Sequence, residues 1–194
     1  MKRIPPDELA RLLAAAEDDA RPLGIEYRQN FTTVAQAYAV QEAVRDIKVR
    51  RGGRVVGKKI GLTSRAMQRQ FDVTRPDYGN LFSDQLYPQG EPIPAAKFIR
   101  PMVEGEIAFV LKDDLQGPGV TPADVVQASR GVMACLEFVD FRWDVPPKFD
   151  VFHSIADNAS CGGFLLGSKL VPLENLDLRH IAMFVEKNVV LVSS

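Results

Sequence analysis

The chain has 194 residues, of which 46% are hydrophobic and 25% charged, and its formal net charge is −1. These values are typical of one globular domain, or of one domain with a small appendage. The near-neutral charge, without a basic block, argues against nucleic acid and anionic membranes as partners. No apolar run is long enough to span a bilayer, and the N-terminus lacks the apolar stretch of a signal peptide.

Cysteine and histidine are scarce. Cys135 and Cys161 lie among apolar or small residues and are each expected to be a buried thiol in a reducing cytoplasm, with a disulfide or a catalytic thiol as the less favoured alternatives. His153 and His180 are far apart in sequence, which argues against a zinc site and gives little support to a Ser-His-Asp triad.

Two helices are predicted first. Leu9, Leu12, Leu13 and Ala16 recur at helical spacing, and Thr33 with Gln36 fits a capping box for a second helix that ends before Gly52-Gly53. We expect residues 1–53 to form an N-terminal helical layer, and residues 54–194 to form a β-rich domain.

Beyond residue 53, predicted strands alternate with short predicted helices. Strands are predicted over residues 54–61, 102–111, 132–139, 163–167 and 181–185, because apolar and β-branched residues cluster there. Thr63 or Ser64 is expected to cap a short helix, and Thr121-Pro122-Ala123-Asp124 to start another that ends near Arg130. Many strands with few interspersed helices indicate an α+β fold built around a folded-over sheet.

Three glutamates interrupt the apolar strands. Glu104 and Glu106 lie two residues apart, so they project from one face, with Cα atoms about 7 Å apart. Glu137 interrupts the predicted strand 132–139. Buried carboxylates need a counter-charge, and oxygen ligands suit a hard cation such as Mg²⁺ or Mn²⁺. The alternative for the pair alone is the solvated face of a half-exposed sheet.

Other polar residues could contribute chemistry. Alternation sends Lys58 and Lys59 to opposite faces of their strand, so one of them is expected to face inward, near the carboxylates; both could instead lie on an edge strand. The hydroxyls of Thr63 and Ser64 suit a carboxylate ligand or simply cap a helix.

Two further polar segments read most simply as loops. Pro76-Asp77-Tyr78-Gly79 is predicted to be a turn. Residues 156–163 are small and polar, and could bring Ser160 and the backbone close to a ligand or form only a tight loop.

Several segments, in order, resemble the hydratase branch of the fumarylacetoacetate hydrolase superfamily, and specifically the 2-hydroxypenta-2,4-dienoate (2-oxopent-4-enoate) hydratases. The segments are Val56-Gly57-Lys58-Lys59-Ile60-Gly61-Leu62-Thr63-Ser64, Pro76-Asp77-Tyr78-Gly79, Glu104-Gly105-Glu106-Ile107-Ala108-Phe109, Gly117-Pro118-Gly119-Val120-Thr121, Ala156-Asp157-Asn158-Ala159-Ser160-Cys161-Gly162 and Val185-Glu186-Lys187-Asn188. They cover the chain from about Val55 onward, with a looser match before it.

The resemblance implies a folded-over mixed β-sheet (a β-roll) and a metal-dependent hydro-lyase, with residues 54–194 as its metal-binding catalytic domain, incomplete relative to the family. The expected reaction adds water to 2-hydroxypenta-2,4-dienoate and gives 4-hydroxy-2-oxopentanoate, in meta-cleavage catabolism of aromatic compounds. Mg²⁺ or Mn²⁺ would be held by Glu104, Glu106 and Glu137. Lys59, Asp77 and Ser160 would line the pocket as catalytic residues, and Lys59, Thr63, Ser64 and Ser160 would bind substrate.

A cytoplasmic homo-oligomer is also implied, with an association with 4-oxalocrotonate decarboxylase. Three alternatives to the hydratase stay open: a 4-oxalocrotonate (2-oxo-3-enedioate) decarboxylase, a hydrolase of a carbon–carbon bond in a diketo acid, and a truncated, non-catalytic partner subunit.

Two departures from the family pattern concern the end of the chain. Family members continue for several dozen residues beyond the equivalent of Ser194, which indicates a C-terminally truncated fold. The family's Asn-Gly turn is Asn188-Val189 here, and valine accommodates the positive φ of a tight hairpin poorly, so the last stretch is not expected to pair as it does in relatives. A third departure is that the family's Val-Asp-Ser-Arg is Val139-Asp140-Phe141-Arg142.

Overall fold

The computed structural model describes residues 4–24, 26–27, 31–144, 151–174 and 176–193. Its α-helices are α1 (Pro6–Asp18), α2 (Val34–Arg50), α3 (Arg65–Gln70), α4 (Pro122–Ala128) and α5 (Val151–Ala156). Its strands are β1 (Val55–Gly61), β2 (Asp77–Phe82), β3 (Leu86–Tyr87), β4 (Met102–Leu111), β5 (Ser129–Val139), β6 (Cys161–Leu166), β7 (Val185–Lys187) and β8 (Val190–Ser193). Short 3₁₀ turns occupy Ser83–Gln85, Ala95–Lys97, Asn158–Ser160 and Leu178–His180.

Three helices, α2, α3 and α4, begin where the sequence predicts. The Thr33 hydroxyl accepts a hydrogen bond from the Gln36 amide at the start of α2. Thr121 and Asp124 form a reciprocal capping box at the start of α4. Each such cap satisfies an amide that the helix itself leaves unpaired.

A hydrophobic core joins α1, α2 and α5. Its fully buried members include Leu9, Val40, Trp143 and Ile155. Burial of each large apolar side chain contributes about 1.5–3 kcal/mol, which makes this cluster a firm support for the segments attached to it. None of the described helices is long and apolar enough to cross a membrane.

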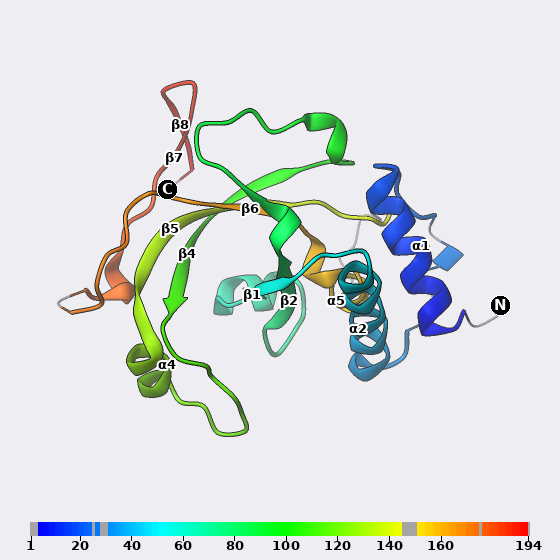
Figure 1. Cartoon of the computed structure of the whole chain (residues 1–194), viewed down its shortest axis with the longest axis horizontal. Helices are drawn as coiled ribbons and strands as arrows, with labels where there is room; N and C mark the ends of the chain where they lie inside the picture. Colours follow the sequence, from blue (N-terminus) through cyan, green and yellow to red (C-terminus); the bar gives the residue numbers. More distant parts are fainter. Residues whose placement is uncertain (1–3, 25, 28–30, 145–150, 175, 194) are drawn as a thin grey trace.

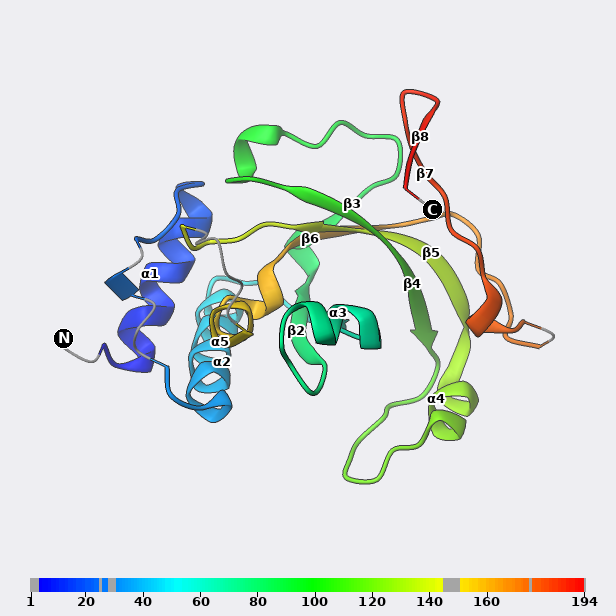
Figure 2. The same cartoon turned by 180° about the vertical axis from the view of Figure 1, so that it is seen from behind.

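The main sheet is mixed and has the strand order β3-β6-β5-β4. β5 pairs antiparallel with both β4 and β6, whereas β3 pairs parallel with β6. β1 and β2 form a separate antiparallel pair. Figure 1 and Figure 2 show the main sheet curving over β1, β2 and α3, with α1 and α2 beyond one end of it.

Two details of the sequence prediction are wrong. Asp77 does not lie in a turn but begins β2, where it pairs opposite Gly61. Residues 181–184 form no strand, and β7 begins only at Val185. The last stretch forms the antiparallel hairpin β7–β8, in which Asn188 and Val189 join the strands with positive φ, at 52° and 58°, although valine disfavours this conformation.

Candidate metal centre and catalytic site

Glu104, Glu106 and Glu137 come together on one face of the main sheet. Glu104 lies directly opposite Glu137 in the β4–β5 register, and Glu106 lies opposite Cys135. Residues directly opposite one another in an antiparallel pair share a face. One carboxylate oxygen from each glutamate lies within 4.8 Å of those of the other two. The three side chains are called the carboxylate trio below.

The carboxylate trio carries more negative charge than its surroundings neutralise. Glu137 is buried, whereas Glu104 and Glu106 are exposed. Although Glu106 is exposed, partial desolvation of its carboxyl by the surrounding side chains raises its pKa, and the charges of Glu137 and Glu104 add to that rise. Burial and the charge of Glu104 also raise the pKa of Glu137, although Lys59 acts in the opposite direction. Such a group favours a bound cation.

Within the described part of the chain, Lys59 is the cation that forms an ion pair with the trio. Its ammonium lies 2.6 Å from Glu137 Oε1 and donates a hydrogen bond of 3.0 Å to the Ala159 carbonyl. Burial lowers the pKa of Lys59, but the neighbouring carboxylate of Glu137 outweighs burial, so the pKa is raised. Lys59 therefore stays a cation at neutral pH, and one such charge cannot balance three carboxylates.

Asp77 and Ser160 bring two oxygens without protein partners. Asp77 is 3% exposed and accepts a hydrogen bond of 3.0 Å from the Ser154 hydroxyl through Oδ2. Within the described part of the chain, Asp77 Oδ1 and the Ser160 hydroxyl are buried and have no hydrogen-bond partner. Buried polar atoms are nearly always satisfied, so these two oxygens are free to meet a ligand.

Space for Asp77 depends on a glycine. A Cβ built on Gly61, which pairs opposite Asp77, would lie only 2.2 Å from Asp77 Oδ1. The small residue in β1 thus leaves room for the carboxylate. Ser154 and Gly61 were not singled out from the sequence, since neither carries a motif that marks it.

The remaining predicted residues are Thr63, Ser64 and Lys58. Thr63 and Ser64 are exposed, and the Ser64 hydroxyl accepts a hydrogen bond from the Met67 amide as the cap of α3, which is one of the two roles that the sequence predicts for this pair. Among the described residues, neither hydroxyl is hydrogen-bonded to the carboxylate trio. Lys58 points away from Lys59 along the strand, donates to Asn80 Oδ1 and lies over the Tyr78 ring. Only Lys59 of the lysine pair faces the trio.

The donor set of the trio fits a hard divalent cation. Three carboxylate oxygens converge, and the local charge is negative even after Lys59 is counted. Mg²⁺ and Mn²⁺ prefer oxygen ligands, and a cation would compensate the repulsion within the trio.

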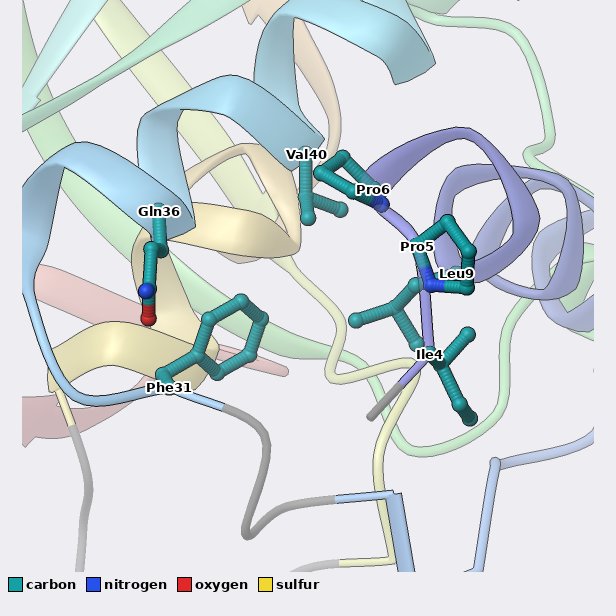
Figure 3. Close-up of a pocket in the computed structure, with 7 residues that line it drawn as sticks. All are labelled: Ile4, Pro5, Pro6, Leu9, Phe31, Gln36 and Val40. Carbon is teal, nitrogen blue, oxygen red and sulfur yellow. The ribbon is translucent and has the colours of Figure 1, made fainter. Parts of the chain in front are cut away.

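A second pocket, away from the carboxylate trio, is lined by side chains that cannot ionise. It has a volume of about 270 Å³ and lies between the starts of α1 and α2, where Figure 3 shows its lining: Ile4, Pro5, Pro6, Leu9, Phe31, Gln36 and Val40. None of these side chains is ionisable. This pocket is therefore not assigned a role in catalysis.

Known proteins similar to the chain are metabolic enzymes. It is 45% identical over 166 residues to a 2-hydroxypent-2,4-dienoate hydratase of Pseudomonas putida, a match that covers 84% of this chain and 73% of the relative. It is 47% identical over 150 residues to a 2-keto-4-pentenoate hydratase of Burkholderia vietnamiensis, a match that covers 76% of this chain but only 56% of the relative. No family model matches the sequence.

A solved structure shares the fold. The 4-oxalocrotonate decarboxylase from Pseudomonas putida G7, complexed with magnesium and adipate, superposes with a TM-score of 0.90 at 36% identity. The superposition covers 99% of this chain and 73% of that one.

Proposed function

The chain belongs to the family of 2-hydroxypenta-2,4-dienoate (2-keto-4-pentenoate) hydratases, and on that premise we propose that it hydrates 2-hydroxypenta-2,4-dienoate to 4-hydroxy-2-oxopentanoate. The observation that carries the proposal is the convergence of the carboxylate trio beside the Lys59 ammonium. The matched regions span 73% and 56% of the two relatives' lengths, so the activity is proposed for the protein to which this sequence belongs.

We propose that Glu104, Glu106 and Glu137 hold Mg²⁺ or Mn²⁺. A magnesium ion in the solved decarboxylase, which shares the fold, supports this assignment. When bound, the cation supplies positive charge against the negative charge that develops on the C2 oxygen of the substrate.

Lys59 would serve the anionic substrate in two ways. Its ammonium reduces the negative charge of the site, so that a carboxylate-bearing substrate can approach. Lys59 and Asp77 are also the candidates for moving protons, one of which must reach C5 while another leaves the water that adds at C4. The unpartnered Asp77 Oδ1 is available for such a transfer.

Ser160, with Thr63 and Ser64, is proposed to hold the substrate. The buried, unpartnered Ser160 hydroxyl can donate to the substrate carboxylate or to its C2 oxygen. Thr63 and Ser64 are exposed in the loop that follows β1, the strand that carries Lys59. Their part is supported only by this position and by the resemblance of the segment.

The experiment follows the loss of dienol absorbance with Mg²⁺ and with EDTA. Hydration predicts metal-dependent loss and the appearance of 4-hydroxy-2-oxopentanoate. The Glu106→Gln variant removes one charged ligand but little volume, and it should lose most of the turnover. Full Mg²⁺-dependent turnover by this variant would exclude the proposed role of the trio.

Decarboxylation is the second candidate function, because the solved structure that shares the fold is a 4-oxalocrotonate decarboxylase. The two reactions differ in one product, since only decarboxylation releases CO₂. Release of CO₂ from 4-oxalocrotonate, without hydration of the dienoate, would favour this candidate. The hydratase names of the sequence relatives favour hydration.

The finer structural and cellular features are proposals as well. We infer that the curved mixed sheet is a β-roll of the fumarylacetoacetate hydrolase type, a view that the shared fold with the decarboxylase supports. A cytoplasmic homo-oligomer that associates with such a decarboxylase stays a prediction. Metal binding without turnover, together with co-purification of a decarboxylase, would indicate a non-catalytic subunit.

A further inference from the structure

The site is assembled from two separate sheets. The carboxylate trio lies on β4 and β5 of the main sheet, whereas Lys59 and Asp77 lie on the β1–β2 pair. The distance between Lys59 and the trio therefore depends on whatever fixes the β1–β2 pair against the main sheet.

A buried amide is one of the contacts that make this connection, together with the hydrogen bond from Gln85 to the Cys161 carbonyl of β6. Asn158 Oδ1 accepts the Asn80 backbone amide at 2.7 Å, and Asn158 Nδ2 donates to the Asn80 carbonyl at 2.8 Å. Asn80 Nδ2 donates to the same Oδ1 at 3.2 Å, and Asn158 is only 2% exposed. The side chain thus binds the free edge of β2 as another strand would. Asn158 and its bonds to Asn80 are called the amide clamp below.

The amide clamp stabilises an uncommon backbone turn. Asn158, Ala159 and Ser160 all have positive φ, at 55°, 51° and 56°, and β6 of the main sheet follows at once. L-residues disfavour this conformation, although asparagine tolerates it best. The turn aims the Ala159 carbonyl at the Lys59 ammonium and places the unpartnered Ser160 hydroxyl beside it in sequence.

Close contact between the turn and β2 requires a glycine. Gly79 pairs opposite Lys59, and a Cβ built on it would lie 2.3 Å from the Asn158 carbonyl oxygen and 3.2 Å from the Ala159 Cβ. A methyl group at this position would push the turn away from the strand.

We propose that Asn158 is a positioning residue that, through the amide clamp, holds Lys59 at the carboxylate trio; its effect on turnover rests on the proposed function. Asn158 acts through Lys59 and the turn, and it is not assigned to contact the substrate. Loss of the clamp lets the β1–β2 pair move relative to the main sheet, while the core formed by α1 and α2 stays intact.

The test labels lysines in the folded protein with an acetylating reagent and quantifies them by peptide mass spectrometry. Lys48 is the internal control, because its side chain is 10% exposed and lies 2.6 Å from Glu17. Lys59 is 11% exposed and lies 2.6 Å from Glu137. In the wild type both should be labelled slowly and at similar rates.

Two variants attack the clamp from opposite sides. Asn158→Gly removes the amide but accepts the positive φ, and Gly79→Ala keeps the amide but pushes the turn away. Each should raise labelling of Lys59 at least tenfold relative to Lys48, and each should lower kcat at least tenfold. The matched control is Gly57→Ala on β1, whose new Cβ would meet the Leu81 side chain, with its flexible Cδ1 the nearest atom at 3.3 Å. It should change neither quantity.

Three results would overturn the proposal. In a folded clamp variant, Lys59 could be labelled as slowly as in the wild type, or it could be labelled faster while kcat stays unchanged. Labelling could also rise equally at Lys48 and Lys59, which would indicate general loss of structure. If the wild type shows no turnover, the proposed function fails, and the ratio of Lys59 to Lys48 labelling alone decides whether the clamp holds Lys59.

Discussion

Replacement of Glu106 by glutamine is expected to stabilise the metal-free protein and to weaken its binding of Mg²⁺. The Glu106 carboxylate lies within 4.8 Å of those of Glu104 and Glu137. Two like charges at that separation repel by about 1 kcal/mol in water, and by about 3.5 kcal/mol at an effective dielectric constant of about 20. Because Glu106 is exposed, the lower figure applies to each pair, and the variant should gain about 1–2 kcal/mol.

The assay compares thermal unfolding after EDTA treatment with Mg²⁺ titration by calorimetry. A gain of about 1–2 kcal/mol corresponds to a rise in Tm of about 2–8 °C for a chain of this size. Loss of one anionic ligand should raise the Kd for Mg²⁺ by at least about tenfold. Glu91→Gln, at an exposed position after β3, is the control and should change neither quantity. A metal-free Glu106→Gln protein that melts lower and binds Mg²⁺ as well as the wild type would refute the reasoning.

Three other perturbations follow from the structure. Lys59→Met leaves Glu137 buried without its counter-charge, so it should lower the free energy of unfolding of the metal-free protein by about 3–5 kcal/mol, measured by urea unfolding. Addition of Mg²⁺ should restore part of this loss. A metal-free variant as stable as the wild type would contradict the prediction. Burial raises the pKa of Glu17, but Arg142 and Lys48 outweigh burial and lower it, so its stabilisation is present above pH about 4.3 and is lost as pH falls through the folded pKa. The deficit of Glu17→Gln, about 1–3 kcal/mol at neutral pH, should therefore vanish in strong acid, and a pH-independent deficit would be the wrong result. Burial and the charge of Glu137 raise the pKa of Cys161 to about 12, so iodoacetamide should modify it only in denaturant, and alkylation of the native protein would count against its burial.

The carboxylate trio could be predicted because strand periodicity is local. Spacing alone places Glu104 and Glu106 on one face, and the register then puts Glu137 opposite Glu104. Alternation predicts only that one lysine of the Lys58-Lys59 pair faces inward. The family resemblance points to Lys59, and the structure places Lys59 against Glu137.

The start of β2 is not predicted from the sequence, because its residues are typical of turns as well as able to serve in this strand. Pro76, Asp77 and Gly79 are typical of turns, yet Asp77 pairs opposite Gly61, and Gly79 leaves space for the turn at Asn158. Side-chain space of this kind is set by a segment nearly eighty positions away in the chain. The local sequence around Gly79 therefore gives no sign that a distant segment needs this space.

The amide clamp could not be predicted from the sequence either, because it joins segments that are far apart in the chain. The segment around Asn158 reads as a small polar loop, and nothing in it marks which side chain pairs with β2. At Val189 the local residue preference is misleading instead, since the β7–β8 hairpin forms although valine disfavours the positive φ that it adopts there. There, pairing of β7 with β8 outweighs a local preference.

A crystal structure of the protein grown with Mn²⁺, with anomalous data collected at the manganese edge, tests the central claim most directly. The account predicts an anomalous peak bounded by carboxylate oxygens of Glu104, Glu106 and Glu137. A protein that diffracts well and shows no peak between these three side chains, at Mn²⁺ concentrations that support turnover, would contradict it.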